Sequence, residues 1–137
     1  MKETRREAQR WLRQAENDLQ YARLGLQGGF HAQVCFQCQQ IAEKALKSIH
    51  YGKLGKRIVY GHSLVELAAE LELDLSLRQE LAVLDQYYIP TRYPNGLPGG
   101  TPYEVYSRAQ AEAAMAACDR VLDLANRSLP PADQAER

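Results

Sequence analysis

The sequence predicts an all-α protein, an antiparallel up-down four-helix bundle with a broken third helix and a long Pro/Gly-rich loop before the last helix. Apolar residues recur at steps of three and four along most of the chain, and no segment alternates apolar and polar residues as a strand does. Ser/Thr-x-x-Glu/Gln capping boxes precede the apolar runs. A chain of 137 residues is typical of one domain. We expect that domain to cover residues 1–129 and a disordered tail to follow over residues 130–137.

The first helix is expected to begin at Thr4, because Thr4 and Glu7 have the spacing of a capping box. Gly28 and Gly29 are expected to end it, since glycine readily adopts the left-handed conformation that follows many helices. Between these ends lies one stripe of apolar residues: Ala8, Leu12, Ala15, Leu19, Ala22 and Leu26.

The second helix is expected over residues 30–50. Phe36 falls on its polar face, together with Gln40, Glu43 and Lys47, and a large aromatic residue there can mark a partner surface. The inner face is predicted to consist of Val34, Cys35, Cys38, Ile41, Ala42, Ala45, Leu46 and Ile49.

Two further capping boxes, at Ser63 and at Ser76, predict the broken third helix. The sequence leaves open whether this region is one broken helix or two. Its inward residues are predicted to be Leu64, Leu67, Ala68 and Leu71 in the first part, and Leu77, Leu81, Leu84 and Tyr88 in the second.

The segment 89–105 contains four of the six prolines and three of the nine glycines, which argues against regular structure. A loop of this length in a compact domain is more often functional than filler. Ser107 and Gln110 form the capping box of the last helix, which Pro130 and Pro131 are expected to end. Its inner side is predicted to carry Ala111, Ala114, Cys118, Val121, Leu122 and Ala125.

The composition restricts the function classes. Seventeen Lys and Arg balance seventeen Asp and Glu, which removes the strong basic excess of a protein that coats nucleic acid. Three cysteines cannot all pair within the chain and favour reduced thiols and a cytoplasmic location. No secretory signal is recognised, and the uncharged run 24–42 holds five glutamines, so we expect no membrane span.

Four groups of residues resemble the HEPN domain family and occur in the order that this family shows. They are Trp11-x-x-x-Ala15-x-x-Asp18-Leu19, then Phe36-x-x-Gln39-Gln40-x-x-Glu43-Lys44-x-Leu46-Lys47, then Gly61-His62-Ser63-Leu64-x-x-Leu67, and finally Tyr87 with Thr91-Arg92-Tyr93-Pro94. The resemblance covers residues 8–127.

The resemblance implies a helical bundle, dimeric or of higher order, that acts beside a minimal nucleotidyltransferase in a toxin–antitoxin-like two-component system. Many members of this family are metal-independent ribonucleases with an Arg-x(4–6)-His motif before the last helix. The resemblance puts Arg92 at the arginine position, but residues 97–99 are Leu, Pro and Gly, and the tyrosine that some family toxins add beyond the histidine is missing too. Arginine supplies charge but no usable base, so we expect binding rather than cleavage.

Three other motifs have alternative interpretations. Arg57 and His62 have the Arg-x4-His spacing, but in the loop before the third helix, where packing or capping beside Ser63 competes with catalysis. Cys35 and Cys38 form a C-x-x-C run, which we interpret as buried small hydrophobes because a zinc site would need more ligands. No metal or other cofactor is therefore expected. His31 and His50 are expected at the surface.

The candidate ligand-binding residues are Arg92, Tyr93, Lys44, Lys47 and Tyr87. Arg92 is interpreted as a phosphate anchor. The alternative is that Arg92 pairs with a carboxylate of the protein and so fixes the loop. Five tyrosines flank Arg92 in the sequence and suit base stacking, but they equally suit a loop packed on the bundle. They are Tyr87, Tyr88, Tyr93, Tyr103 and Tyr106. The basic stretch made of Lys44, Lys47, Lys53, Lys56 and Arg57 fits either a phosphate-attracting groove or a solvated helix end.

The sequence thus favours a dimeric nucleotide- or RNA-binding module. Two alternatives stay open. One is a ribonuclease with a displaced histidine, either His62 or a residue brought in across a dimer. The other is a structural, oligomeric adaptor without a ligand.

Overall fold

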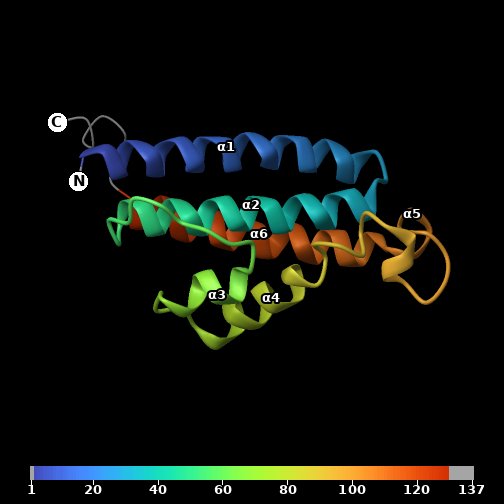
Figure 1. Ribbon diagram of the computed structural model, residues 1–137. Helices are drawn as coiled ribbons and strands as arrows, with labels where there is room; N and C mark the ends of the chain where they lie inside the picture. The colour runs from blue at the N-terminus through green and yellow to red at the C-terminus, as the bar shows by residue number, and fades with distance from the viewer. Residues whose placement is uncertain (1, 130–137) are drawn as a thin grey trace.

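The computed structural model describes residues 2–129, and within them it contains helices and loops but no strand. Four helices are short and three are long (Figure 1). Their bounds are α1 Lys2–Gln27, α2 His31–Gly52, α3 Leu64–Ala69, α4 Leu75–Asp85, the 3-10 helix η1 Pro94–Gly96, α5 Pro102–Val105 and α6 Arg108–Ser128. The tail predicted over residues 130–137 lies outside the described residues.

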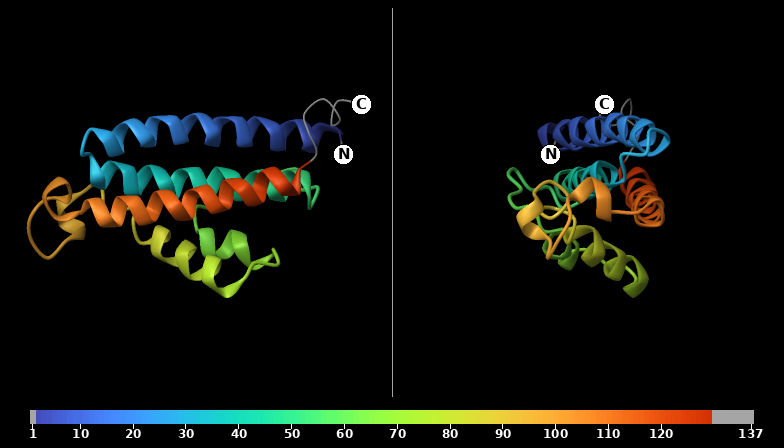
Figure 2. Two further views of the ribbon diagram at one scale, coloured as in Figure 1. Left: turned by 180° about the vertical axis from the view of Figure 1, so that it is seen from behind. Right: turned by 90° about the vertical axis from the view of Figure 1, so that its right-hand side faces the viewer.

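The long helices α1, α2 and α6 lie side by side, and α3 with α4 forms a shorter fourth member of the bundle (Figures 1 and 2). The chain direction alternates from α1 to α2, to α4 and to α6, which confirms the up-down bundle with a broken third helix. The central helix is α2, which packs against α1, α3, α4, α5 and α6. Residues on α2 are therefore held from several sides at once.

The hydrophobic core confirms the predicted inner faces of α2 and α6, whose named residues are all buried. The apolar stripe of α1 is also buried, except that Leu26 at its end is only half-buried. In the second part of the third helix, Leu77, Leu81 and Leu84 are buried, whereas Tyr88 is half-buried and its neighbour Tyr87 turns inward instead.

Several predicted helix ends are confirmed. Gly29, with φ +82°, follows α1, and Ser107 forms a complete capping box with Gln110 at the start of α6. Ser63 caps α3, whose first backbone N–H groups also donate to the carboxylate of Asp85. Because Asp85 is the last residue of α4, this contact ties the two parts of the broken helix together.

Two predicted caps are wrong. α1 already begins at Lys2, so Thr4 lies in the first turn and is buried instead of capping the helix. The N-cap of α4 is Asp74 and not Ser76, because the Asp74 carboxylate accepts the N–H of Leu77 at 2.7 Å.

The proline-rich segment is more regular than predicted. It contains η1 and α5, and each of these short helices has a proline in its first turn, where the missing N–H costs nothing.

The polar side of α2 is more buried than the sequence suggested. Glu43 and Lys47 are each 6% exposed, because α2 is packed on by other elements on that side as well. The prediction that His50 is a surface residue is wrong: its ring is fully buried, and Nε2 donates to the carbonyl oxygen of Leu67 at 2.7 Å. No helix in the part of the chain that the structure describes is long and apolar enough to cross a membrane.

Candidate functional site

Arg92 lies on a group of aromatic rings that we call the Arg92 platform, made of Phe36, Tyr88 and Tyr93. The guanidinium carbon is 4.4 Å from the ring centroid of Phe36, 4.8 Å from that of Tyr88 and 5.4 Å from that of Tyr93. These distances are typical of cation–π contacts, which orient the planar guanidinium without neutralising it. The platform joins α2 to the segment that follows α4.

The guanidinium of Arg92 is exposed and keeps its terminal nitrogens available. Its Nε donates to the carbonyl oxygen of Tyr88 at 2.8 Å, which fixes the side chain. Among residues 2–129 no carboxylate forms an ion pair with it, so the alternative of an acid that pins the loop does not apply within that range. A fixed guanidinium with unused donors is suited to bind an anion such as phosphate.

His62 also contacts Tyr88. Its ring stacks on that of Tyr88, with 5.1 Å between centroids and 22° between planes. Arg92 and His62 therefore share Tyr88 as a common support, although they lie far apart in the sequence.

The position of His62 is determined by two residues of α2. Nδ1 of His62 is 3.1 Å from Oε1 of Glu43, and the amide of Gln39 donates to the carbonyl oxygen of His62 at 2.8 Å. Because a carboxylate only accepts, the hydrogen of this contact is assigned to Nδ1. The side chain is 62% exposed, so Nε2 can meet a ligand.

Glu43 also binds Lys47, and this pair is almost completely buried. Oε2 of Glu43 is 3.1 Å from Nζ of Lys47, and the exposed fractions of the Lys47 and Glu43 side chains are 7% and 8%. Lys47 in turn lies over the indole of Trp11, at 5.4 Å from the ring centroid. The sequence predicts Lys47 as a ligand contact. In the structure its ammonium group is buried and already paired with Glu43, which leaves little of it for a ligand to contact.

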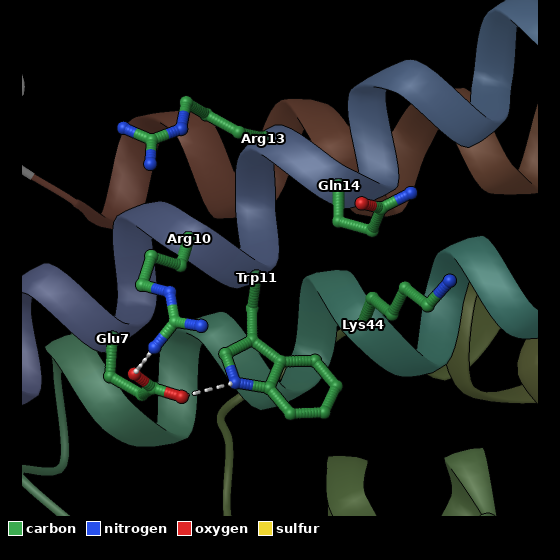
Figure 3. A pocket seen from close by; sticks show the side chains of 6 residues that line it. All are labelled: Glu7, Arg10, Trp11, Arg13, Gln14 and Lys44. Carbon is green, nitrogen blue, oxygen red and sulfur yellow. Dashed lines mark hydrogen bonds and ion pairs between the residues drawn. The ribbon is translucent and has the colours of Figure 1, made fainter.

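An open cleft of about 540 Å³ lies between α1 and α2 (Figure 3). We call it the Trp11 cleft, and its walls are Glu7, Arg10, Trp11, Arg13, Gln14 and Lys44. Glu7 accepts from Nε1 of Trp11 and from Arg10, both at 3.0 Å, and so holds both side chains on its carboxylate. Lys44 forms an ion pair with Asp18 of α1.

The structure gathers some of the predicted ligand-binding residues and separates others. Arg92 and Tyr93 lie together, Lys44 lies in the Trp11 cleft, and Lys47 is buried in its pair with Glu43. Tyr87 faces the interior, edge-on to Tyr106 at 5.7 Å, and burial raises the pKa of its hydroxyl.

The basic stretch does not form a continuous groove. Lys56 pairs with Glu70, and Arg57 lines a separate cavity with Glu3 and Glu7 near the start of α1. Since His62 lies against Glu43 and Tyr88, the Arg57-x4-His62 spacing does not bring these two residues into one site.

The three cysteines are core residues, as interpreted from the sequence. All are buried, and burial raises the pKa of the Cys35 thiol to about 12. A contact with Cys118, together with burial, also raises the pKa of the Cys38 thiol. Cys38 lies 3.5 Å from the sulfur of Met115 as well. Within residues 2–129 no group of three His, Cys, Asp or Glu residues has a geometry that could hold a metal ion.

Phe36 and Tyr88 are site residues that the sequence did not single out as ligand contacts. The signal for Phe36 was present, since it was a large aromatic residue on a polar helix face. For Tyr88 the sequence allows two interpretations, because it is one of the tyrosines that flank Arg92 and suit base stacking, and it also has the apolar spacing of a core residue.

These features define a class of protein: a helical bundle with a long first hairpin, a broken third helix and an exposed arginine on aromatic rings before the last helix. The model of the HEPN domain matches residues 8–128, and the chain belongs to the HEPN domain family. No curated protein sequence matches the chain.

Solved structures agree with this assignment. The chain is 37% identical to TT1696 from Thermus thermophilus, with a TM-score of 0.84, over 90% of this chain and 98% of that one. It is 32% identical to ST0689, an archaeal HEPN homologue, with a TM-score of 0.75 over 88% and 96% of the two chains. A HEPN domain protein from Thermotoga maritima, tm0613, is 28% identical, with a TM-score of 0.66 over 86% and 95%.

Proposed function

We propose that this HEPN domain protein binds a nucleotide or RNA at the Arg92 platform, as a dimer or higher oligomer that acts with a minimal nucleotidyltransferase in a toxin–antitoxin-like system. The observation that supports binding most directly is the exposed guanidinium of Arg92, fixed on aromatic rings and without a carboxylate partner among residues 2–129. The dimer, the partner and the two-component role rest on membership of the family.

The platform offers the two kinds of contact that a nucleotide needs. The guanidinium binds phosphate through charge-assisted hydrogen bonds, and the exposed ring of Tyr93, 52% accessible, provides a surface for a base. Each base stacked on an aromatic ring contributes about 1–3 kcal/mol. Both contacts tolerate different sequences, so we expect little discrimination between bases.

Replacing Arg92 by alanine is expected to weaken RNA binding at low salt about tenfold or more, since a hydrogen bond to a charged group contributes about 1.5–3 kcal/mol. The slope of log K against log salt is expected to fall by about 0.7, the value for one phosphate contact on a single strand. Fluorescence anisotropy of a labelled oligonucleotide over a salt series measures both quantities.

Arg23→Ala is the matched control, because Arg23 is an exposed arginine on α1 outside the platform and the Trp11 cleft. Arg92→Lys keeps the charge but loses the planar group, so an intermediate affinity is expected. Equal affinities of Arg92→Ala and Arg23→Ala would remove the platform as the binding site.

A metal-independent ribonuclease is the second candidate, and one observation favours it. The Glu43 carboxylate orients the imidazole of His62 with Nε2 available, in the manner of a general base, and both His62 and Arg92 contact Tyr88. His62 would then be the general base and Arg92 the group that stabilises negative charge, although the two residues do not form an Arg-x(4–6)-His motif.

Incubation of labelled RNA with the protein in EDTA tests this candidate. Because we propose binding as the main function, we expect the wild type, His62→Gln and Arg92→Ala to give equal amounts of product. Cleavage that survives EDTA and is lost in both variants would instead establish the ribonuclease.

Phe36, which the sequence singled out as a mark of a partner surface, has contacts within its own chain. Phe36 is half-buried beneath Arg92 and against Tyr88, with 6.1 Å between ring centroids, within one chain. We propose that oligomerisation leaves this contact intact, and analytical ultracentrifugation of the wild type and of Phe36→Ala compares their assembly states.

A further inference from the structure

We infer that the Trp11 cleft is a second contact surface for the ligand of the Arg92 platform, so that the ligand is single-stranded RNA several nucleotides long and not a mononucleotide. This inference rests on the proposed function, because it takes the Arg92 platform as one end of the binding surface. It adds a second set of residues, on α1, and a direction along α2.

The chemistry of the Trp11 cleft matches that of a nucleic-acid strand. Three cations, Arg10, Arg13 and Lys44, line the cleft together with the indole of Trp11, and Glu7 is the one acid among the lining residues. The side chain of Arg13 extends from α1 away from the indole (Figure 3), and among residues 2–129 no carboxylate is paired with it. Cationic groups around an aromatic ring are the usual combination for phosphates and stacked bases.

The indole of Trp11 is held by three contacts. Its Nε1 donates to Glu7 at 3.0 Å, the ring stacks on Tyr51 with 6.0 Å between centroids and 26° between planes, and Nζ of Lys47 lies over the ring at 5.4 Å from its centroid. The ring is half-buried, so one part packs against the bundle while another faces the cleft (Figure 3). A ring that is fixed in advance loses little conformational freedom when a base stacks on it.

A row of half-exposed residues on α2 connects the cleft to the platform. Phe36, Gln40 and Lys44 are spaced four residues apart and therefore lie on one face of the helix. The neighbouring row, Gln39, Glu43 and Lys47, is buried. The half-exposed row begins beneath Arg92 and ends in the Trp11 cleft.

The length of this row sets the size of the ligand. The helix from Phe36 to Lys44 spans about 12 Å at a rise of about 1.5 Å per residue. Stacked nucleotides rise about 3.4 Å each, so the row corresponds to about three or four nucleotides. One nucleotide contributes about 3.4 Å of this length, so contact with both ends favours an oligonucleotide over a mononucleotide.

The charges along the path are compatible with a polyanion. Arg92 lies at one end, and Arg10, Arg13 and Lys44 lie at the other. Glu43 and Asp18 are 8% and 15% exposed and are paired with Lys47 and Lys44, and Glu7 in the cleft is paired with Arg10. Their repulsion of phosphate is therefore reduced by an adjacent positive charge.

Binding of labelled oligouridylates of two and of eight nucleotides to the full chain tests the inference. The variant is Arg10→Ala/Arg13→Ala, and its control is Arg23→Ala with a second exposed arginine, Arg108, also replaced by alanine. All four side chains are exposed, so both double variants are expected to fold, and circular dichroism checks this. We expect the cleft variant to bind the octanucleotide about tenfold more weakly than the control and the dinucleotide within about twofold of it.

Each result has a defined meaning. Equal weakening of both oligonucleotides, or of neither, overturns the second contact surface. Arg92→Ala serves as the reference: if it weakens both lengths while the cleft variant weakens neither, the platform stands and the cleft does not. If Arg92→Ala changes neither affinity, the proposed function itself fails.

Discussion

Replacement of Glu43 by alanine is expected to destabilise the protein by about 3–5 kcal/mol, because it removes one partner of a buried ion pair. Lys47 would lose its carboxylate partner in a place where 7% of its side chain is exposed, and among residues 2–129 the indole of Trp11 would be its remaining contact. His62 would lose the acceptor of its Nδ1 proton at the same time. Urea denaturation followed by circular dichroism measures the change in the free energy of unfolding.

Glu112 offers a matched control on the surface. Its pair with Arg108 has the same i,i+4 spacing as Glu43 and Lys47, but the Glu112 and Arg108 side chains are 53% and 68% exposed. Glu112→Ala is therefore expected to cost about 0.5 kcal/mol or less. The double variant Glu43→Leu/Lys47→Met is expected to recover much of the stability, since apolar side chains of similar volume do not need a partner. Equal costs for Glu43→Ala and Glu112→Ala would contradict this account of the buried pair.

Replacement of Leu46 by alanine is expected to destabilise the protein by about 2–5 kcal/mol. Leu46 is fully buried on α2, the helix on which the other α-helices pack, so the space left by the missing atoms cannot be filled by solvent or by a simple movement of one neighbour. The midpoint of urea denaturation is expected to fall while the slope of the transition stays the same.

Leu24→Ala makes the same chemical change on the surface, since Leu24 is 68% exposed on α1. It is expected to cost about 0.5 kcal/mol or less. A loss for Leu46→Ala that is no larger than this would mean that the core around α2 rearranges to fill the space.

The pattern of apolar residues was sufficient to predict the bundle, because burial of a helix face follows local periodicity. The inner faces of α2 and α6 agree residue by residue with the structure. Helix ends were less predictable: Ser107 is a cap, whereas Thr4 and Ser76 have the same spacing and are not. A capping box competes with neighbouring residues, and at α4 the Asp74 carboxylate was available slightly earlier in the chain.

Burial of polar residues on α2 could not be predicted, because their partners come from distant parts of the chain. Lys44 pairs with Asp18, His50 with the carbonyl of Leu67, and Glu43 with His62 in addition to Lys47. A helix face rich in such residues normally faces water. Only the fold shows that other elements cover this one.

Only part of the candidate site could be predicted, because some of its contacts also join distant parts of the chain. Arg92 and Tyr93 could be identified because they lie in a loop with few charges, whereas the shared contact of Arg92 and His62 with Tyr88 depends on how the α2–α3 loop returns along α2. The residues by which the chain resembles its family contact one another in the folded protein. The sequence shows them as four separate groups. The structure joins three of them through Trp11, Lys47, Glu43 and His62, and it joins the fourth through Arg92, which lies on Phe36.

The central place of α2 has a consequence for the evolution of this protein. One helix carries the most heavily packed part of the interior and, on its remaining open side, the residues that face an incoming molecule. A core substitution that shifts or rotates α2 therefore also displaces the exposed side chains of this helix. Selection for a stable core and selection for ligand binding thus act on the same helix. Changes in its buried residues and in its exposed residues are therefore expected to be coupled.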